Sequence, residues 1–191
     1  MSQGTIYIFP QSPRSFWIHQ IISDLNLDIT IKDNKSEEFG ELFPLKKCPA
    51  FIDSTGFKLT ETPVIYKYLV SLAENSTFGG VGAKEEASVA QWLNFTNQDF
   101  SDPIAAIVYI CKDEESTEKN KQKAIGYFEY VNNTLADKKW LVGNQITIAD
   151  IYLFKCFKGF SDFVGGVAHL PNIVRWMGDV ETEKPIYKAL Y

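Results

Sequence analysis

The first part of the chain mixes short strand-like stretches with amphipathic ones. Thr5–Phe9 and Asp28–Lys32 alternate with the period of a strand, while Ala50–Asp53 and Phe57–Leu59 predict a hairpin around Gly56. Apolar residues at helical spacing indicate helices between and after these strands. The expected helices begin at Ser12, Ser36 and Thr62 and end at Leu25, Leu42 and Ala73.

A polar, glycine-rich stretch then separates two kinds of pattern. Glu74–Ala83 contains three glycines and has no apolar period, which is typical of a linker. After it the pattern is helical throughout, over Lys84–Cys111 with a bend near Pro103, Thr117–Ala136, Ile148–Phe163 and Pro171–Val180. We therefore expect an α/β domain over residues 1–74, a linker over 75–83 and an all-α helical-bundle domain over 84–191.

Composition narrows the function classes. The 191 residues are 45% hydrophobic and carry a net charge of -5 without a basic run, so direct nucleic-acid binding is not expected. No apolar run approaches a membrane span, and the N-terminus has no secretion signal. Three distant cysteines without a C-x-x-C motif, and only two histidines, predict no metal site and a reduced, cytoplasmic protein.

The most informative motif lies where the predicted hairpin begins and ends. Pro49 heads a predicted strand, where a residue that cannot donate to the ladder sits at an edge, a bend or a cis bond. A cis bond would leave the backbone N–H and C=O of Cys48 open to a ligand's peptide group. After Glu61, the pair Thr62-Pro63 predicts a helix start with a hydroxyl N-cap. Because such an end attracts anions, the motif predicts a pocket for a small anionic peptide; an ordinary edge strand and capped helix is the alternative.

This constellation resembles the glutathione-binding half of glutathione transferases, whose first domain is thioredoxin-like. The predicted order of elements, β-α-β-α-β-β-α, matches that layout. The resemblance implies that Cys48, beside a cis-Pro49, pairs with the backbone of glutathione. It also implies that Glu61 and Thr62 hold the γ-glutamyl end, with threonine in place of the usual serine.

A second motif starts a predicted helix in the later part of the chain. Thr147 and Asp150 have the T-x-x-D spacing of a capping box, and Ile146 with Ile151 has the spacing of a hydrophobic staple. We expect a structural role here, with a loss of roughly 1–2 kcal/mol or more when Asp150 is removed. The motif also resembles the buried capping segment of the glutathione transferase helical domain, and Pro171–Trp176 resembles the helix that follows it.

The candidate for chemistry is a hydroxyl near the first helix. In this family a tyrosine or serine hydroxyl donates a hydrogen bond to the glutathione thiolate, which lowers the thiol pKa. Tyr7, Ser12 and Ser15 are the candidates, and Ser12 is best placed because a helix N-terminus also favours an anion, with Arg14 adding positive charge. The alternative is that Ser12 is only an N-cap. We interpret the Cys48 side chain as a small apolar filler rather than a nucleophile.

Finer resemblance points to a role in translation. Met1–Thr5, Phe43–Lys47, Pro49–Phe51 and Lys58–Glu61 look like the N-terminal domain of fungal gamma subunits of the eukaryotic translation elongation factor 1 complex. This implies a scaffold that anchors the guanine-nucleotide exchange subunit, with weak or absent conjugation activity. The alternative is an active cytosolic glutathione transferase that conjugates glutathione to small electrophiles. The family resemblance also implies a homodimer, with no cofactor and with glutathione as a possible ligand or co-substrate.

Overall fold

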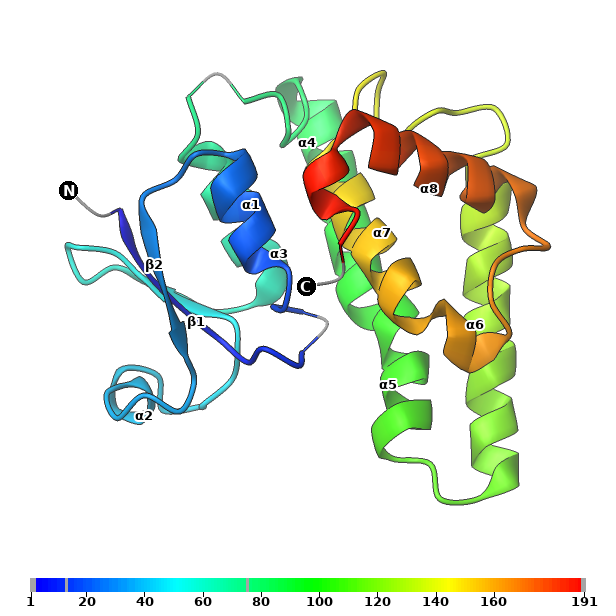
Figure 1. The fold of residues 1–191 in the computed structure, drawn as a ribbon, viewed down its shortest axis with the longest axis horizontal. Coiled ribbons are helices and arrows are strands. Elements are labelled where there is room, and N and C mark those ends of the chain that lie inside the picture. The colour runs from blue at the N-terminus through cyan, green and yellow to red at the C-terminus, as the bar shows by residue number, and fades with distance from the viewer. Residues whose placement is uncertain (1–2, 13, 75, 190–191) are drawn as a thin grey trace. The chain divides into compact units, whose positions relative to one another are not determined.

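The computed structural model describes residues 3–12, 14–74 and 76–189, and the chain divides into two compact units (Figure 1). The first unit ends at Ser76 and the second begins at Thr77. The fold class is the predicted one, an α/β thioredoxin-like unit followed by an all-helical unit. The boundary differs in one detail, because Gly82, which the pattern assigned to a linker, is the first residue of a helix.

A mixed sheet forms the centre of the first unit. In the described residues its strand order is β2-β1-β3-β4, with β1 parallel to β2 and antiparallel to β3, and β3 antiparallel to β4. Because side chains alternate along a strand, Ile6 and Phe51 face one side and Tyr7 and Ala50 the other. The strands are β1 (Gly4–Ile8), β2 (Ile29–Asp33), β3 (Ala50–Ile52) and β4 (Lys58–Leu59).

Helices pack against this sheet through aromatic rings. Trp17 lies with its ring centroid 4.7 Å from that of Tyr66, which joins the first helical segment to α3. Tyr7 packs with Phe39 and Phe43 in a buried cluster that joins the sheet to α2. The helices of this unit are α1 (Ile18–Asp24), α2 (Phe39–Leu42) and α3 (Thr62–Ser71).

Two helices begin later than the pattern predicts. The helix expected from Ser12 becomes regular only at Ile18, and the one expected from Ser36 only at Phe39. Before α1, the buried Ser15 donates its hydroxyl to the Phe9 carbonyl (2.8 Å), which ties the segment to the end of β1. Serine side chains compete with helical backbone bonds in this way, so the residues up to Trp17 form turns instead.

The second unit is built around α7. Every residue from Ile148 to Phe157 is buried, so this helix is covered on all sides. The rings of Phe100, Phe128 and Phe157 meet within 5.2 Å of one another in the core. The α-helices are α4 (Gly82–Phe95), α5 (Ser101–Tyr109), α6 (Glu114–Thr134), α7 (Ile148–Phe160) and α8 (Pro171–Glu183), with short 3-10 turns at Ser161–Val164 and Pro185–Tyr187.

The long helix expected over Lys84–Cys111 is interrupted. A π-helical turn, Thr96–Phe100, separates α4 from α5. Pro103 follows in the first turn of α5, and a proline ring clashes with the carbonyl four residues earlier in a regular α-helix. The turn therefore lies a few residues before the predicted bend, and the Ser101 hydroxyl bonds the Thr96 carbonyl within it (2.5 Å).

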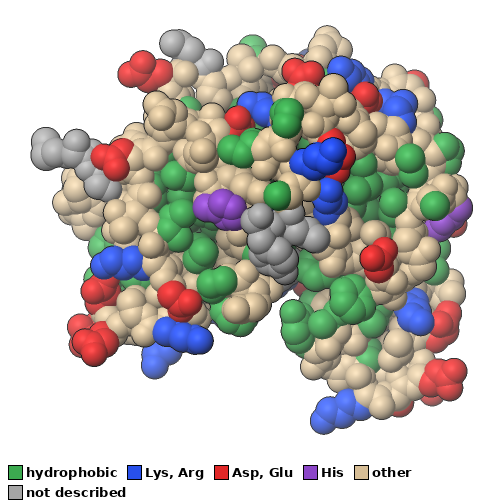
Figure 2. Space-filling model, in the orientation of Figure 1, with side chains coloured by type: hydrophobic (Ala, Val, Ile, Leu, Met, Phe, Trp, Pro, Cys, Tyr) green, Lys and Arg blue, Asp and Glu red, His purple; other side chains and the backbone are tan. Residues whose placement is uncertain are grey.

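The surface carries mixed charges. Figure 2 shows acidic and basic side chains interspersed over the visible face rather than gathered in one patch of a single sign. Within the parts of the chain that the structure describes, no helix is long and apolar enough to cross a membrane.

Candidate functional site

The sheet register brings the sequence motifs of the first unit together. In the β3–β4 pair, Phe51 lies opposite Leu59, so Cys48 and Pro49 precede the paired residues and Glu61 and Thr62 follow them at the same end of the pair. In the β1–β3 pair, Tyr7 lies opposite Ala50, so the segment that follows β1 leaves the sheet next to Cys48. These three chain segments form the candidate site.

The backbone of Cys48, rather than its thiol, is available to contact a ligand. The Cys48–Pro49 peptide bond is cis. Neither the N–H nor the C=O of Cys48 has a hydrogen-bond partner among the described residues. The side chain packs against the buried cluster around Tyr7, and burial, with the nearby Asp33 carboxylate, raises the pKa of the thiol to about 11. A thiol that stays protonated near neutral pH is a poor nucleophile, which favours the role of an apolar filler.

The start of α3 has no side-chain cap. Thr62 was predicted as the N-cap, and this is wrong by one residue: Glu61 is the N-cap and Thr62 begins the helix. The physical reason is that the Glu61 carbonyl already accepts the N–H groups of Val64 and Ile65, both at 3.0 Å. The backbone N–H groups of Glu61 and Thr62 have no partner elsewhere in the described chain. The helix therefore begins with open donors, as an anion site requires.

Glu61 also has an unusual backbone. Its φ of 70° and ψ of 115° lie in a region that residues with a side chain rarely adopt. Such a conformation costs on the order of 1–3 kcal/mol and tends to occur at ligand sites. The Glu61 side chain is exposed, whereas Thr62 is buried.

Ser12 lies in the turn after β1, six residues before α1 begins. Its Oγ accepts the Arg14 N–H at 3.3 Å, and its carbonyl accepts the N–H groups of Ser15 and Phe16. It therefore shapes a turn instead of capping a regular helix. The described residues offer no acceptor for its hydroxyl proton, so this hydroxyl can donate to a ligand while it accepts from Arg14.

The sequence reasoning missed the residue that fixes this turn. Tyr66 of α3 is fully buried and donates its hydroxyl to the Arg14 carbonyl at 2.7 Å. The bond ties the Ser12 turn to the helix whose start carries Glu61 and Thr62. Tyr66 lies one helical turn after Thr62, on the same side of the helix, which is a signal that could have identified it.

Tyr7 is unavailable as a donor to a thiolate. It is buried in β1 and donates its hydroxyl to Glu38 at 2.7 Å. Burial, and then the Glu38 carboxylate, raise the pKa of Tyr7 to about 12. Ser15 is engaged as well, through its bond to Phe9. Of the three candidate hydroxyl groups, that of Ser12 is thus the one whose proton has no acceptor among the described residues.

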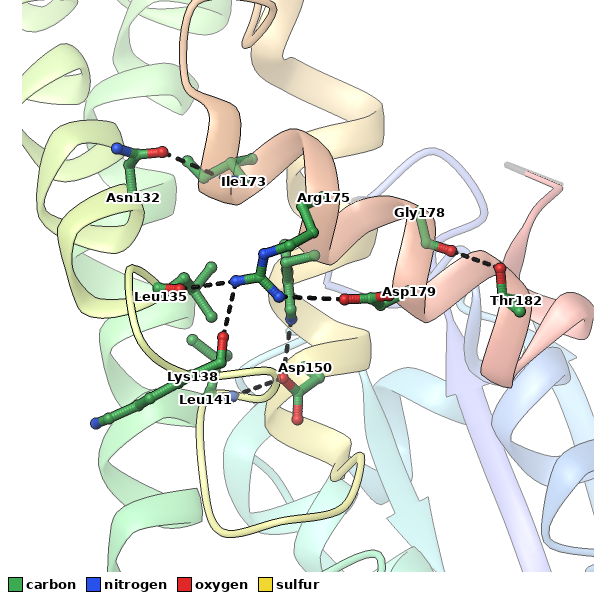
Figure 3. A network of polar contacts seen from close by, with 11 residues as sticks. Asn132, Leu135, Lys138, Leu141, Asp150, Ile173, Arg175, Gly178, Asp179 and Thr182 are labelled. Atoms are coloured by element: carbon green, nitrogen blue, oxygen red, sulfur yellow. Dashed lines mark hydrogen bonds and ion pairs between the residues drawn. The ribbon is translucent and has the colours of Figure 1, made fainter.

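The second predicted motif forms a closed network in the second unit. Thr147 and Asp150 make a capping box at the start of α7, with the Thr147 N–H 3.0 Å from Asp150 Oδ2. Asp150 is fully buried, and its Oδ1 also accepts the Leu141 N–H (2.9 Å) and the Trp176 indole N–H (3.0 Å). Burial raises the pKa of Asp150, against the effect of these hydrogen bonds. Figure 3 shows Asp150 of α7 beside Leu141 of the preceding loop, and Trp176 extends the contacts of Asp150 to α8.

Comparison with known families agrees with this architecture. Residues 2–71 match the glutathione S-transferase N-terminal domain, and residues 88–183 match the glutathione S-transferase C-terminal domain. The two matches correspond to the two compact units.

Individual relatives fall into two groups. The chain is 34% identical to glutathione S-transferase Y-2 of Pichia kudriavzevii over 193 aligned residues, covering 100% of both chains. It is also 34% identical to elongation factor 1-gamma of Schizosaccharomyces pombe, over 84% of this chain and 41% of that protein. The crystal structure of the GST-like domain of elongation factor 1-gamma from Saccharomyces cerevisiae superimposes with a TM-score of 0.82 at 26% identity, over 98% of this chain and 92% of that one. From its two matched domains and these relatives, the chain belongs to the glutathione S-transferase family.

Proposed function

We propose that this chain binds glutathione and conjugates it to small electrophiles. The observation that carries the proposal is the open start of α3, whose unpaired N–H groups lie across the sheet register from the unpaired backbone of Cys48. By contrast, side-chain oxygens accept backbone N–H groups at the starts of α6, α7 and α8. Open donors and acceptors side by side match an extended, anionic peptide.

The γ-glutamyl and cysteinyl parts of glutathione each have a partner in this arrangement. The γ-glutamyl carboxylate binds the Thr62 N–H and hydroxyl at the positive end of the α3 dipole. The Glu61 carboxylate pairs with the α-amino group of the same residue. The cysteinyl peptide group pairs with the N–H and C=O of Cys48, as a strand pairs with a sheet edge.

Ser12 supplies the chemistry. Its hydroxyl donates a hydrogen bond to the glutathione sulfur, which stabilises the thiolate and lowers the thiol pKa. The thiol proton passes to solvent, the sulfur forms a bond to the electrophilic carbon, and the leaving group departs with the bonding electrons. Tyr66 holds the turn in place through the Arg14 carbonyl, so Ser12 is positioned before the substrate arrives.

Conjugation of reduced glutathione to a model aryl halide tests this proposal. We expect saturable turnover in the wild-type protein and nearly the same turnover in Cys48→Ala, because only the backbone of Cys48 binds glutathione. Loss of turnover in Cys48→Ala, with an intact fold and intact glutathione binding, would assign the chemistry to the thiol instead. No turnover in the wild type would remove the conjugation proposal.

A second candidate function is the scaffold role in translation elongation. Similarity to elongation factor 1-gamma of Schizosaccharomyces pombe, and to the GST-like domain of the Saccharomyces cerevisiae protein, favours it. In this case the unit anchors the guanine-nucleotide exchange subunit of the elongation factor 1 complex. Affinity capture from source-cell lysate, eluted first with glutathione and then with salt, tests it. Recovery of that subunit in the salt fraction supports the scaffold, and its absence from both fractions contradicts it.

Both candidate functions include a homodimer and a cytoplasmic location, as the family resemblance implies. Light scattering coupled to size-exclusion chromatography measures the mass directly. Twice the 21.7 kDa of this chain is the expected result, and a single-chain mass at micromolar concentration contradicts it.

A further inference from the structure

The short helix α2 depends on its neighbours for its position. Figure 1 shows it beyond the end of β2 and apart from α1 and α3. It has only four residues, Phe39–Leu42, and a helix of one turn is not stable by itself in water. The contacts that its side chains and its flanking residues make with the sheet must therefore hold it in place.

A cluster of buried rings joins α2 to the sheet on the apolar side. The ring centroids of Phe39 and Phe43 lie 5.3 Å and 5.8 Å from that of Tyr7. Ala50 of β3 belongs to the same buried cluster, and Cys48 packs against it from the residues just before β3. The cluster thus connects α2 with the residue whose backbone lies in the candidate glutathione site.

Glu38, the residue before α2, links the start of the helix to two strands. Its Oε1 accepts the Tyr7 hydroxyl of β1 at 2.7 Å and the Lys32 ammonium of β2 at 2.5 Å. The hydrogen bond from Lys32, and then that from Tyr7, lower the pKa of Glu38, so the carboxylate is ionised near neutral pH. Hydrogen bonds to an ionised acceptor are roughly twice as strong as those between neutral groups.

Lys58 of β4 holds the other end of α2. Its ammonium donates to the Leu42 carbonyl at 3.0 Å. The same ammonium lies 5.7 Å from the centroid of the Phe43 ring, which is within the range of a cation–π contact. A positive charge is also favourable at the C-terminal end of a helix, where Leu42 lies. Charged side chains therefore fix α2 at both of its ends.

We propose that Glu38 and Lys58 are positioning residues for glutathione binding. They hold α2 in place, α2 holds the aromatic cluster, and the cluster sets the orientation of Cys48 and of its backbone N–H and C=O. Close packing transmits a shift of α2, because a protein interior has few voids that could absorb it. The inference rests on the proposed glutathione site and adds two residues that act on it through Cys48.

Two measurements on matched variants test this inference, the amide resonance of Cys48 in the ligand-free protein and the glutathione Kd from calorimetry. Glu38→Ala should shift the Cys48 resonance and weaken glutathione binding about fivefold or more, as is typical of coupled sites. Glu37→Ala removes the same charge from the neighbouring exposed residue and should change neither. An unshifted Cys48 resonance in Glu38→Ala, or equal changes in the two variants, would overturn the inference.

Kinetics separate positioning from a general loss of stability. In Glu38→Ala the KM for glutathione should rise while kcat at saturating glutathione stays the same, because Glu38 does not contact the Ser12 turn. Glu38→Gln keeps an oxygen that can accept from Tyr7 and should restore most of the affinity. A fall in kcat without a rise in KM, or an equal loss in Glu38→Gln and Glu38→Ala, would contradict the positioning role.

Lys58 has a matched control of its own. Lys58→Met keeps an apolar stem of similar length and loses the donor to the Leu42 carbonyl. We expect severalfold weaker glutathione binding and a shifted Cys48 resonance, whereas Lys67→Met, at an exposed position of α3, should leave both unchanged. Equal effects of the two variants would show that only the lost charge matters, and would remove Lys58 from the inference.

Failure of the proposed function would give a different result from failure of this inference. If the wild type does not bind glutathione at millimolar concentration, the glutathione site is removed. The Cys48 resonance of Glu38→Ala still decides the coupling in that case, since a shift supports it and no shift overturns it. Glutathione binding that is equally tight in the wild type and in Glu38→Ala would overturn the role in binding.

Discussion

The helix starts of α3 and α7 look alike in sequence and differ in structure. Each has a threonine near the first helical residue, Thr62 in α3 and Thr147 in α7. At α7 the third residue after the threonine is Asp150, whose carboxylate closes the box. At α3 the corresponding residue is Ile65, which cannot accept a backbone N–H. The closed start stabilises the second unit, and the open start leaves donors for a ligand.

The difference shows how one local motif serves two purposes. Where the donors are satisfied internally, the helix start contributes to stability and is buried. Where they are left open beside a strained residue such as Glu61, stability is lower and an anion can bind. Substitutions at residues of each kind should separate these two roles.

Removal of Asp150 should have the largest effect. Asp150→Ala leaves the Leu141 N–H, the Trp176 indole and the Thr147 N–H buried without their acceptor. The expected loss is about 3–5 kcal/mol in the free energy of unfolding. Urea unfolding measures it, with Asp113→Ala as control, because Asp113 caps α6 at the exposed surface. Similar losses in the two variants would show that the buried network adds nothing beyond an ordinary cap.

Removal of the Ser12 hydroxyl should affect turnover rather than folding. Ser12→Ala is expected to lower kcat for glutathione conjugation about 100-fold, the usual effect of losing one donor to a developing anion. Glutathione affinity should change little, since Ser12 contacts only the sulfur.

Tyr7→Phe is the matched control for Ser12→Ala, because the Tyr7 hydroxyl is engaged by Glu38. It should retain wild-type turnover. A reversed pattern, with Tyr7→Phe inactive and Ser12→Ala active, would assign the thiolate contact to tyrosine.

Lys155 extends the comparison to a buried charge in the second unit. It is fully buried on α7 and bonds the carbonyls of Tyr187 and Ala189. Burial, and then the nearby Lys158, lower the pKa of Lys155 to about 8. Between pH 8 and the unfolded pKa near 10.4, the unfolded state binds more protons, so this group makes stability rise with pH.

In the wild type, Lys155 should raise the free energy of unfolding by on the order of 2 kcal/mol as the pH rises over that range. The Lys155→Met variant should lack this rise. Urea unfolding at several pH values measures the difference between variant and wild type. Parallel pH profiles would contradict a lowered pKa for Lys155.

Glu61→Gly should produce the smallest change in stability, and in the favourable direction. Glycine adopts a φ of 70° without strain, so the free energy of unfolding should rise by about 0.5–1 kcal/mol. Glutathione binding should weaken severalfold at the same time, because the carboxylate that pairs with the amino group is lost. Calorimetry and urea unfolding check the two effects. Weaker binding without a gain in stability would argue against strain at Glu61.

Much of the first unit could be predicted from its sequence, because alternation and helical period fix the elements. The uncapped start of α3 could not be predicted, since Thr62 with Pro63 has the composition of a capped helix start. The register of β3 and β4 decides that Cys48 lies beside Glu61, and pairing register depends on long-range contacts. The bond from Tyr66 to Arg14 crosses 52 positions and likewise has no local signal.

In the second unit the capping box could be predicted from Thr147 and Asp150, because both partners lie within one helical turn. The further hydrogen bonds of Asp150 to Leu141 and Trp176 could not be predicted, since they depend on how the loop and α8 pack. The π-helical turn at Thr96–Phe100 was also missed, because Pro103 indicates a bend but not its position.

An NMR titration of the backbone amides with reduced glutathione tests whether the open start of α3 binds glutathione. We expect saturable shifts at Cys48, Glu61 and Thr62, with no change at Leu141 and Thr147, whose donors are already bound to Asp150. Saturable binding that leaves Cys48, Glu61 and Thr62 unshifted, or no binding at millimolar glutathione, would contradict the assignment of the open α3 start as the glutathione site.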